Sequence, residues 1–440
     1  RHCRHSIRFS GNISQLINSG AFFTSYNLFK VLCQTLQMME PKSENQLDEV
    51  QRQIFERIAK NDVNGFKQLI TQLKAGVDFV DDDGMTPLQH ACCKGNKEAV
   101  QMLLDMGADI NFNKHGADYT PLHFAALSGN TDVCRLILDA GINPNSLNSV
   151  SRTASQMAAF VGNHSCVETI NNYVPRKTLE YYTRAQGQQK EPLIPPGMMD
   201  LFHQFVIEIN LHPVRIALNL QSLGLLKHLE GLKKCLEYMC EKEMKKTNDV
   251  NELMAFKFHY LGWIVSELMR CEEQCKAQRK EKLSEVDAGK HDFVELFIKR
   301  VLKENKVGQL DYIEFTLRDC VREFPFRDCT VFRQVVSQLA AKDPQPALMV
   351  FRNAINGHRG FADDTSYCSS CGNEKPDKKC SKCKQVKYCD RECQRLHWFM
   401  HKKTCARPIS NVTASTSTST AKEAIDVTEL HEELSKITTS

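Results

Sequence analysis

The stretch CSSCGNEKPDKKCSKCKQVKYCDRECQRLHWFMHKKTC, residues 368–405, decides how the C-terminal part of this chain folds. It contains seven of the chain's 19 cysteines, and a histidine completes a set of eight possible metal ligands. Their spacing is C-x2-C-x8-C-x2-C-x5-C-x3-C-x7-H-x3-C. Because a structural zinc ion takes four Cys or His ligands, this pattern predicts two tetrahedral zinc sites. The eight ligands are Cys368, Cys371, Cys380, Cys383, Cys389, Cys393, His401 and Cys405.

The spacing and the intervening residues resemble the MYND zinc finger at all eight ligand positions. The resemblance implies that the ligand pairs interleave, so that the first and third pairs hold one ion and the second and fourth pairs the other. His397 could replace His401 as a ligand, but the family pattern favours His401. The implied ligands of the first ion are Cys368, Cys371, Cys389 and Cys393, and those of the second are Cys380, Cys383, His401 and Cys405.

A filled ligand shell leaves no position for a reactive water, so these zinc ions should be structural and should supply most of the finger's folding free energy. Gln394 and Trp398 are four residues apart and therefore share a face if the stretch from Cys393 to Cys405 is helical. The resemblance implies that these two positions hold proline-rich peptides of the P-x-L-x-P type. The alternative is that Trp398 packs inside the small domain, because an indole buries a large area.

A second pattern, with a period of 33–34 residues, begins near Gln46. The segment MTPLQHA at 85–91 returns as YTPLHFA at 119–125 and, in a weaker form, as RTASQMA at 152–158. Both the period and the T-P-L-H-x-A signature resemble the ankyrin repeat. We therefore expect ankyrin repeats over 45–175, three of them clear and one degenerate.

The turn residues of this pattern agree with a helix–turn–helix unit. Thr86 can cap a helix whose first residue is Pro87, where a missing amide proton costs nothing. Gly95 should separate the two helices of its repeat, and Gly107 should supply the left-handed residue that follows the second. The first, degenerate repeat lacks this start signal, as is typical of a capping repeat.

The other segments lack motifs of this strength. Residues 1–39 contain no acidic residue, and Met38 and Met39 at their end stand just before a charged, helix-forming segment, as a start site would. This predicts a disordered or non-native leader over 1–39. Residues 183–197, rich in proline and glutamine, are interpreted as a linker. Apolar stripes of helical period predict an α-helical domain of about six helices over 198–360. Residues 407–440 should form a disordered tail, since they cannot bury enough apolar area.

Composition limits the class of protein. With 440 residues, 25% charged and 42% hydrophobic, the chain has the proportions of a globular protein of several domains. It has no apolar run of the length that spans a bilayer. The cysteines outside the finger are dispersed among apolar positions, which indicates reduced thiols and a cytoplasmic or nuclear location. We therefore expect an all-α-dominated protein of several domains, with no membrane segment.

Parts of the sequence could also indicate three other functions: a methyltransferase, a ubiquitin ligase and a nucleic-acid-associated regulator. The run Asn163-His164-Ser165-Cys166 matches a motif of SET–MYND methyltransferases. Asn163, however, is also the asparagine that recurs after a glycine in the ankyrin period. A RING-type ubiquitin ligase usually has C-x2-C in its later ligand pairs, whereas this chain has C-x3-C and H-x3-C. A nuclear or nucleic-acid-associated regulator would use the lysines of 366–407. Two zinc ions and seven thiolates, however, reduce the net charge of this segment from +7 to about +4.

The combination of modules resembles the ankyrin-repeat and MYND-domain protein family, and the module order is most similar to that of its second member. Both modules are protein-binding in that family, so the resemblance implies a non-enzymatic adaptor. Its expected partners are a proline-rich peptide at the finger and an unidentified protein at the ankyrin surface, and nucleic acid is not expected. The resemblance also implies trafficking of signalling proteins to the cilium, and hence a cytoplasmic and ciliary location, with the nucleus as an alternative.

Overall fold

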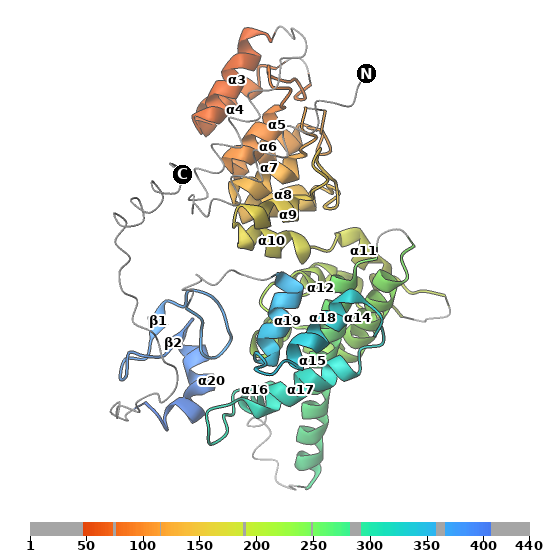
Figure 1. The fold of residues 1–440 in the computed structure, drawn as a ribbon, viewed down its shortest axis with the longest axis vertical. Coiled ribbons are helices and arrows are strands. Elements are labelled where there is room, and N and C mark those ends of the chain that lie inside the picture. The colour runs from red at the N-terminus through yellow and green to blue at the C-terminus, as the bar shows by residue number, and fades with distance from the viewer. Residues whose placement is uncertain are drawn as a thin grey trace, which may run out of the picture.

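The computed structural model describes residues 47–73, 76–114, 116–187, 191–247, 250–281, 292–357 and 366–405. Helices dominate these residues, and the only sheet among them has two strands. A stack of helix pairs, a helical middle domain and a cysteine-rich finger follow one another along the chain (Figure 1). This confirms the predicted fold class. The predicted leader and tail lie outside the described residues, and no described helix is long and apolar enough to cross a membrane.

The N-terminal stack consists of four consecutive helix pairs (Figure 1). The first helices of neighbouring pairs pack on one another, and so do the second helices. Buried side chains from all four pairs form one continuous apolar core. The pairs are α3 (Glu49–Ala59) with α4 (Val63–Ile70), α5 (Pro87–Lys94) with α6 (Lys97–Asp105), α7 (Pro121–Ser128) with α8 (Thr131–Asp139), and α9 (Ala154–Phe160) with α10 (His164–Asn171).

The repeated residues of the stack form its caps and its contacts between repeats. Thr86 accepts a hydrogen bond from the Gln89 amide at 3.3 Å, and the Gln89 side chain accepts one from the Thr86 amide at 2.9 Å. Gln89 also donates to the Tyr119 carbonyl of the next repeat at 2.9 Å. Gly95 and Gly107 have positive φ, as predicted. The signature therefore specifies both where a helix begins and how one repeat holds the next.

The middle domain contains more helices than the predicted six, because several are short and follow one another after a few residues. Its buried side chains include all three predicted apolar stripes. The helices are α11 (Arg176–Glu180), η1 (Tyr181–Thr183), η2 (Pro196–Met198), α12 (Met199–Val206), α13 (Pro213–Ser222), η3 (Leu225–His228), α14 (Leu229–Met244), α15 (Glu252–Glu281), α16 (Phe293–Val301), α17 (Asp311–Arg322), α18 (Thr330–Leu339) and α19 (Ala347–Asn356).

The segment interpreted as a linker, 183–197, is in close contact with this domain. Ile194 is fully buried in the core of the domain. The Leu193 carbonyl approaches α14 so closely that a Cβ on Gly231 would lie 2.1 Å from its oxygen. Only glycine fits that position of α14. The segment that joins the stack to the middle domain is thus packed against that domain just before η2.

A short loop, Glu208–His212, connects the three parts of the molecule. Asn172, which ends α10 of the stack, donates to the Asn356 side chain of α19 at 3.0 Å. Asn356 in turn donates to the Ile209 carbonyl at 3.0 Å. From the same loop, Asn210 donates to the Cys371 carbonyl of the finger at 3.1 Å. Side-chain amides therefore connect the stack, the middle domain and the finger through one loop.

The base of this loop is held by two fully buried side chains of α15. Tyr260 donates its hydroxyl proton to the Leu211 carbonyl at 2.6 Å, and Lys257 donates to the Glu208 carbonyl at 2.9 Å. Both side chains have no exposed surface. Burial lowers the pKa of Lys257 to about 7 from its usual 10.5, because the charged ammonium loses its hydration. Lys257 thus places a strongly pH-dependent group under the loop.

We expect Lys257→Met to remove part of the pH dependence of stability. Between pH 10.5 and 7 the unfolded chain holds a proton on this amine that the folded chain releases, so stability is lost as pH falls. From pH 8.5 to 7 this loss should be about 1.6 kcal/mol in the wild type. The measurement is urea unfolding at both pH values, followed by Trp263 fluorescence in a Trp398→Phe background.

The matched control is Lys303→Met, which removes an exposed lysine of the same domain. Its unfolding free energy should change with pH as that of the wild type does. An equal pH dependence in Lys257→Met and the wild type would contradict the prediction, even if the variant were less stable at both pH values.

Candidate metal centre

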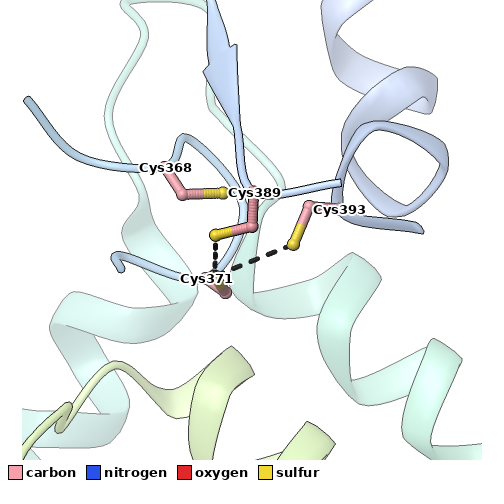
Figure 2. A group of neighbouring side chains, drawn as sticks. All are labelled: Cys368, Cys371, Cys389 and Cys393. Atoms are coloured by element: carbon pink, nitrogen blue, oxygen red, sulfur yellow. Dashed lines mark hydrogen bonds between the residues drawn. The ribbon is translucent and has the colours of Figure 1, made fainter. Parts of the chain in front are cut away.

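The finger brings the eight predicted ligands together in two separate groups of four. In each group the ligand atoms all lie within 4.8 Å of one another. The groups have the interleaved composition that the MYND resemblance implied. One contains Cys368, Cys371, Cys389 and Cys393 (Figure 2), and the other contains Cys380, Cys383, His401 and Cys405.

The distances within each group fit a tetrahedral zinc ion. Two thiolates 2.3 Å from a common ion should be separated by about 3.8 Å, and a thiolate and an imidazole nitrogen by about 3.6 Å. The Sγ atom of Cys371 lies 3.6 Å from that of Cys389 and 3.7 Å from that of Cys393 (Figure 2). In the second group the Sγ atoms of Cys380 and Cys405 are 3.6 Å apart. Both groups therefore have the size and the donor atoms of a closed structural zinc site.

Tight turns hold the first pair of each group. The Cys368 amide donates to the Asn373 carbonyl at 2.8 Å, and the Gly372 amide donates to the Cys368 carbonyl at 3.0 Å. The Lys384 amide donates to the Cys380 carbonyl at 2.9 Å. The antiparallel strands β1 (Lys378–Lys379) and β2 (Lys387–Tyr388) precede and follow the second turn, with Lys378 paired to Tyr388. The turns place the two cysteines of each first pair close to each other.

Helix α20 (Arg391–His401) carries the later ligands. Asp390 caps it and accepts a hydrogen bond from the Cys393 amide at 2.8 Å. The two ligands of each x3 pair, Cys389 with Cys393 and His401 with Cys405, lie only partly within this helix. Cys389 precedes the helix, and Cys405 follows it, although the Cys405 amide still donates to the His401 carbonyl at 2.8 Å. Each pair has one ligand within α20 and one beyond its end.

The alternative ligand His397 belongs to neither group. Its Nδ1 atom lies 3.0 Å from the Tyr388 hydroxyl, with which it shares a hydrogen bond. The Nε2 atom of His401 instead lies 3.4 Å from the Cys383 sulfur. His397 therefore orients Tyr388, a buried residue at the end of β2, and leaves the fourth ligand position to His401.

The surroundings favour the thiolate, which is the form that binds zinc, at one cysteine of each group, whereas loss of hydration raises the pKa of others, such as Cys389 and Cys405. A hydrogen bond from the Cys383 amide lowers the pKa of Cys380 to about 6. Hydrogen bonds from the thiols of Cys371 and Cys393 lower the pKa of Cys368. Each group thus stabilises at least one thiolate through bonds that the fold supplies.

The first metal group lies against the middle domain, on the side of the Glu208–His212 loop. Gly372 has φ of +68°, and a Cβ there would lie 3.0 Å from the His212 ring. Loss of hydration at this contact lowers the pKa of the half-buried His212 to about 4, so the ring that meets the finger is neutral. On the other side, Arg395 of α20 forms a 3.0 Å ion pair with Glu295 of α16. No motif or period in the sequence predicts these contacts.

Gln394 and Trp398, the predicted peptide-binding residues, lie one turn apart on α20. Trp398 keeps 43% of its surface exposed, and Gln394 is half-buried. The Trp398 ring contacts the His401 ring edge to face, with centroids 5.8 Å apart. The residues of α20 that face the inside of the finger are instead Cys393, Leu396, Met400 and His401.

Two family models match the parts of the chain described above. A model of ankyrin repeats, in three copies, matches residues 55–148, and a model of the MYND finger matches residues 368–405. The chain contains ankyrin repeats and a MYND finger. Both are protein-interaction modules, and the two Cys/His clusters are the structural zinc sites of the finger.

Relatives of this ankyrin–MYND protein include two from Caenorhabditis elegans. Dauer abnormal formation protein 25 is 29% identical over 360 residues, which are 80% of this chain and 89% of the relative. SET domain-containing protein 14 is 46% identical over 41 residues, only 9% of this chain and 10% of the relative. The first likeness covers most of this chain, whereas the second is confined to a short segment.

The methyltransferase-like motif of this ankyrin–MYND protein has a structural role. Asn163 donates hydrogen bonds to the Ala126 carbonyl at 3.0 Å and the Leu127 carbonyl at 2.9 Å in the preceding repeat. Asn130, one period earlier, donates to the Gly95 carbonyl at 2.9 Å in the same way. Cys166 is fully buried in the core of the stack. The stack therefore accounts for Asn163 and Cys166 without any methyltransferase chemistry.

Proposed function

We propose that this protein is a non-enzymatic adaptor that holds one partner on its ankyrin stack and a proline-rich peptide on α20 of its finger. The observation that carries this proposal is the exposure of Trp398 on a helix that also supplies one ligand to each metal group. An aromatic ring of this size is usually buried in so small a domain. Left exposed beside Gln394, it offers a surface on which an extended proline and leucine segment can lie.

The ankyrin stack also exposes large apolar side chains in the part that would face a partner. Leu147 and Val150 lie between α8 and α9 with exposed fractions of 54% and 60%, and Phe160 ends α9. Exposed apolar side chains of this size can contribute to a protein-binding surface. The loop Glu208–His212 would keep the two binding surfaces in a fixed relation, because it is bonded to the middle domain and the finger.

Trp398→Ala should abolish binding of a P-x-L-x-P peptide while both zinc ions remain. A central aromatic of a binding site can contribute about 2 kcal/mol or more, which corresponds to a loss of roughly thirtyfold in affinity. Gln394→Ala should cost about 1 kcal/mol, from lost hydrogen bonds to the peptide backbone. Peptide affinity and zinc content are to be measured on the same preparation of each variant.

Arg391→Ala is the matched control, because Arg391 is another exposed residue of α20. Its peptide affinity should stay within about twofold of the wild type. If Trp398→Ala lost zinc together with binding, Trp398 would be a packing residue and the proposed peptide surface would be wrong.

We further propose that the adaptor acts in the cytoplasm, in trafficking of signalling proteins to the cilium. The support for this step is the resemblance of its module order to the ankyrin-repeat and MYND-domain family. The test is to tag the full chain in ciliated cells, delete it, and measure the amount of signalling receptors in the cilium. An unchanged ciliary receptor content, or a purely nuclear location of the tagged chain, would contradict the proposal.

A further inference from the structure

The middle domain carries a groove of about 470 Å³ between α14 and α15 that the proposed adaptor function does not use. The two helices are consecutive in the chain and pack along one another (Figure 1). On α15 the groove extends from His259 to Glu273, a stretch that is about 21 Å long in a helix. Its elongated shape suits a segment of polypeptide better than a compact small molecule.

Two small residues one turn apart on α15, Gly262 and Ser266, leave room for the groove. A Cβ on Gly262 would meet only the Cβ of Leu236 on α14, at an ordinary contact distance of 3.7 Å, so the absence of a side chain leaves open space there. Ser266 donates its hydroxyl proton to the Gly262 carbonyl at 3.0 Å, which leaves its oxygen lone pairs available to a ligand. The larger side chains of Trp263 and Met269 stand beside them on the same helix and form a wall.

The wall already binds a cation within the chain. The guanidinium carbon of Arg270 lies 5.5 Å from the centroid of the Trp263 ring. The His259 ring lies 6.4 Å from the same indole and is tilted by 34°. An indole face in contact with a positive charge is attracted to it by the ring quadrupole. The groove therefore has an aromatic surface that accepts cations.

The rim of the groove carries more negative than positive charge. Glu237, Glu241, Glu273 and Glu323 line it, together with Lys233 and Arg270. Both cations are paired with carboxylates, Lys233 with Glu237 at 3.9 Å and Arg270 with Glu267.

Two of the rim carboxylates are available to a ligand. Glu273 and Glu323 are exposed and form no ion pair within the described part of the chain. They would repel nucleic acid and anionic lipid, and they would attract a basic ligand.

We propose that the groove between α14 and α15 binds a basic segment of a partner protein. A lysine or arginine of this segment would reach Glu273 and Glu323, while its aliphatic stem and a neighbouring apolar residue pack on Trp263 and Met269. Tryptophan and methionine are enriched at protein interfaces, and long basic side chains combine an apolar stem with a charged end. The negative charge of the rim and the length of the groove together favour a basic polypeptide segment as the partner.

The test uses the fact that the chain has only two tryptophans. In a full-length Trp398→Phe background, Trp263 is the single tryptophan and reports directly from the groove. The probe is a peptide of about 14 residues, the length that spans the groove as a helix, with leucine and lysine at helical spacing. We expect a saturable change in Trp263 fluorescence with this peptide and none with its counterpart in which glutamate replaces lysine.

Charge reversal then tests the site. The double variant Glu273→Lys and Glu323→Lys should bind the lysine peptide at least about tenfold more weakly. The control Asp343→Lys reverses an exposed charge elsewhere in the same domain and should stay within about twofold. Equal affinities in both variants, or no saturable signal in the parent, would overturn the proposal. Because Trp398 is replaced throughout, either outcome leaves the proposed function of the finger untouched.

Discussion

Cys383→Ser and Cys389→Ser should each reduce the zinc content of the full chain from two ions to one. The two residues belong to different metal groups, whose ligand atoms do not overlap. A serine hydroxyl is not a thiolate at neutral pH and cannot replace it as a zinc ligand. Structural zinc contributes on the order of 10–16 kcal/mol in small finger peptides, so the loss of either ion should disrupt most of the finger. Elemental analysis of the purified variants measures this result.

The control for this experiment is Cys93→Ser, which changes a half-buried cysteine of the ankyrin stack and should keep both ions. The two finger variants should also differ from each other. The group with Cys389 includes Cys371, whose carbonyl accepts from Asn210, so its loss should release the finger from the middle domain. Hydrogen exchange of the loop Glu208–His212 should therefore rise in Cys389→Ser. A chain that retained two zinc ions in either variant would contradict the assigned groups.

Ala125→Asp should unfold the central repeats of the stack as one unit. Ala125 lies in α7 with no exposed surface, where α7 packs on both α5 and α9. A carboxylate there would lose its hydration in an apolar core without a partner, at a cost of about 3–5 kcal/mol. Because each repeat is stable only against its neighbours, the damage should spread to them. Hydrogen exchange of the full chain should show loss of protection in α5, α7 and α9 together.

Ala140→Asp makes the same chemical change at an exposed position of the same stack. Its expected cost is below about 1 kcal/mol, since Ala140 follows α8 and only meets the negative end of that helix. If Ala125→Asp left the protection of α5 and α9 unchanged, the shared core between the repeats would be wrong.

The sequence by itself determined the local features of this protein. Ligand spacing was enough to predict two four-ligand zinc groups, because residues two to four apart can reach one ion only through a tight turn or a helical turn. The 33–34-residue period was enough to predict the helix pairs, because Thr86, Pro87 and Gly107 impose their caps locally. The apolar stripes of α15, α16 and α17 were visible for the same reason, since helical period is a property of a single element.

Some local signals were ambiguous, and the surroundings of the residues resolved them. His397 and His401 lie on the same helix at positions that could both supply a ligand. The tertiary structure distinguishes the ligand from the other histidine. His397 shares a hydrogen bond with Tyr388, whereas His401 lies beside the sulfur of Cys383. The proline-rich segment 183–197 has the composition of a linker, yet Ile194 is buried in the core of the middle domain. An isolated apolar residue shows no period that would predict such burial.

Only the tertiary structure decided how the three parts are joined. Asn172 and Asn356 are 184 residues apart in sequence, and Asn210 and Cys371 are 161 apart, yet each pair is hydrogen-bonded. Single asparagines are typical of exposed turns, and a lysine such as Lys257 is typical of a surface, so neither type predicts burial. Their roles depend on which carbonyls the packed helices bring within reach. That arrangement is set by the summed packing of many side chains, which no short stretch of sequence contains.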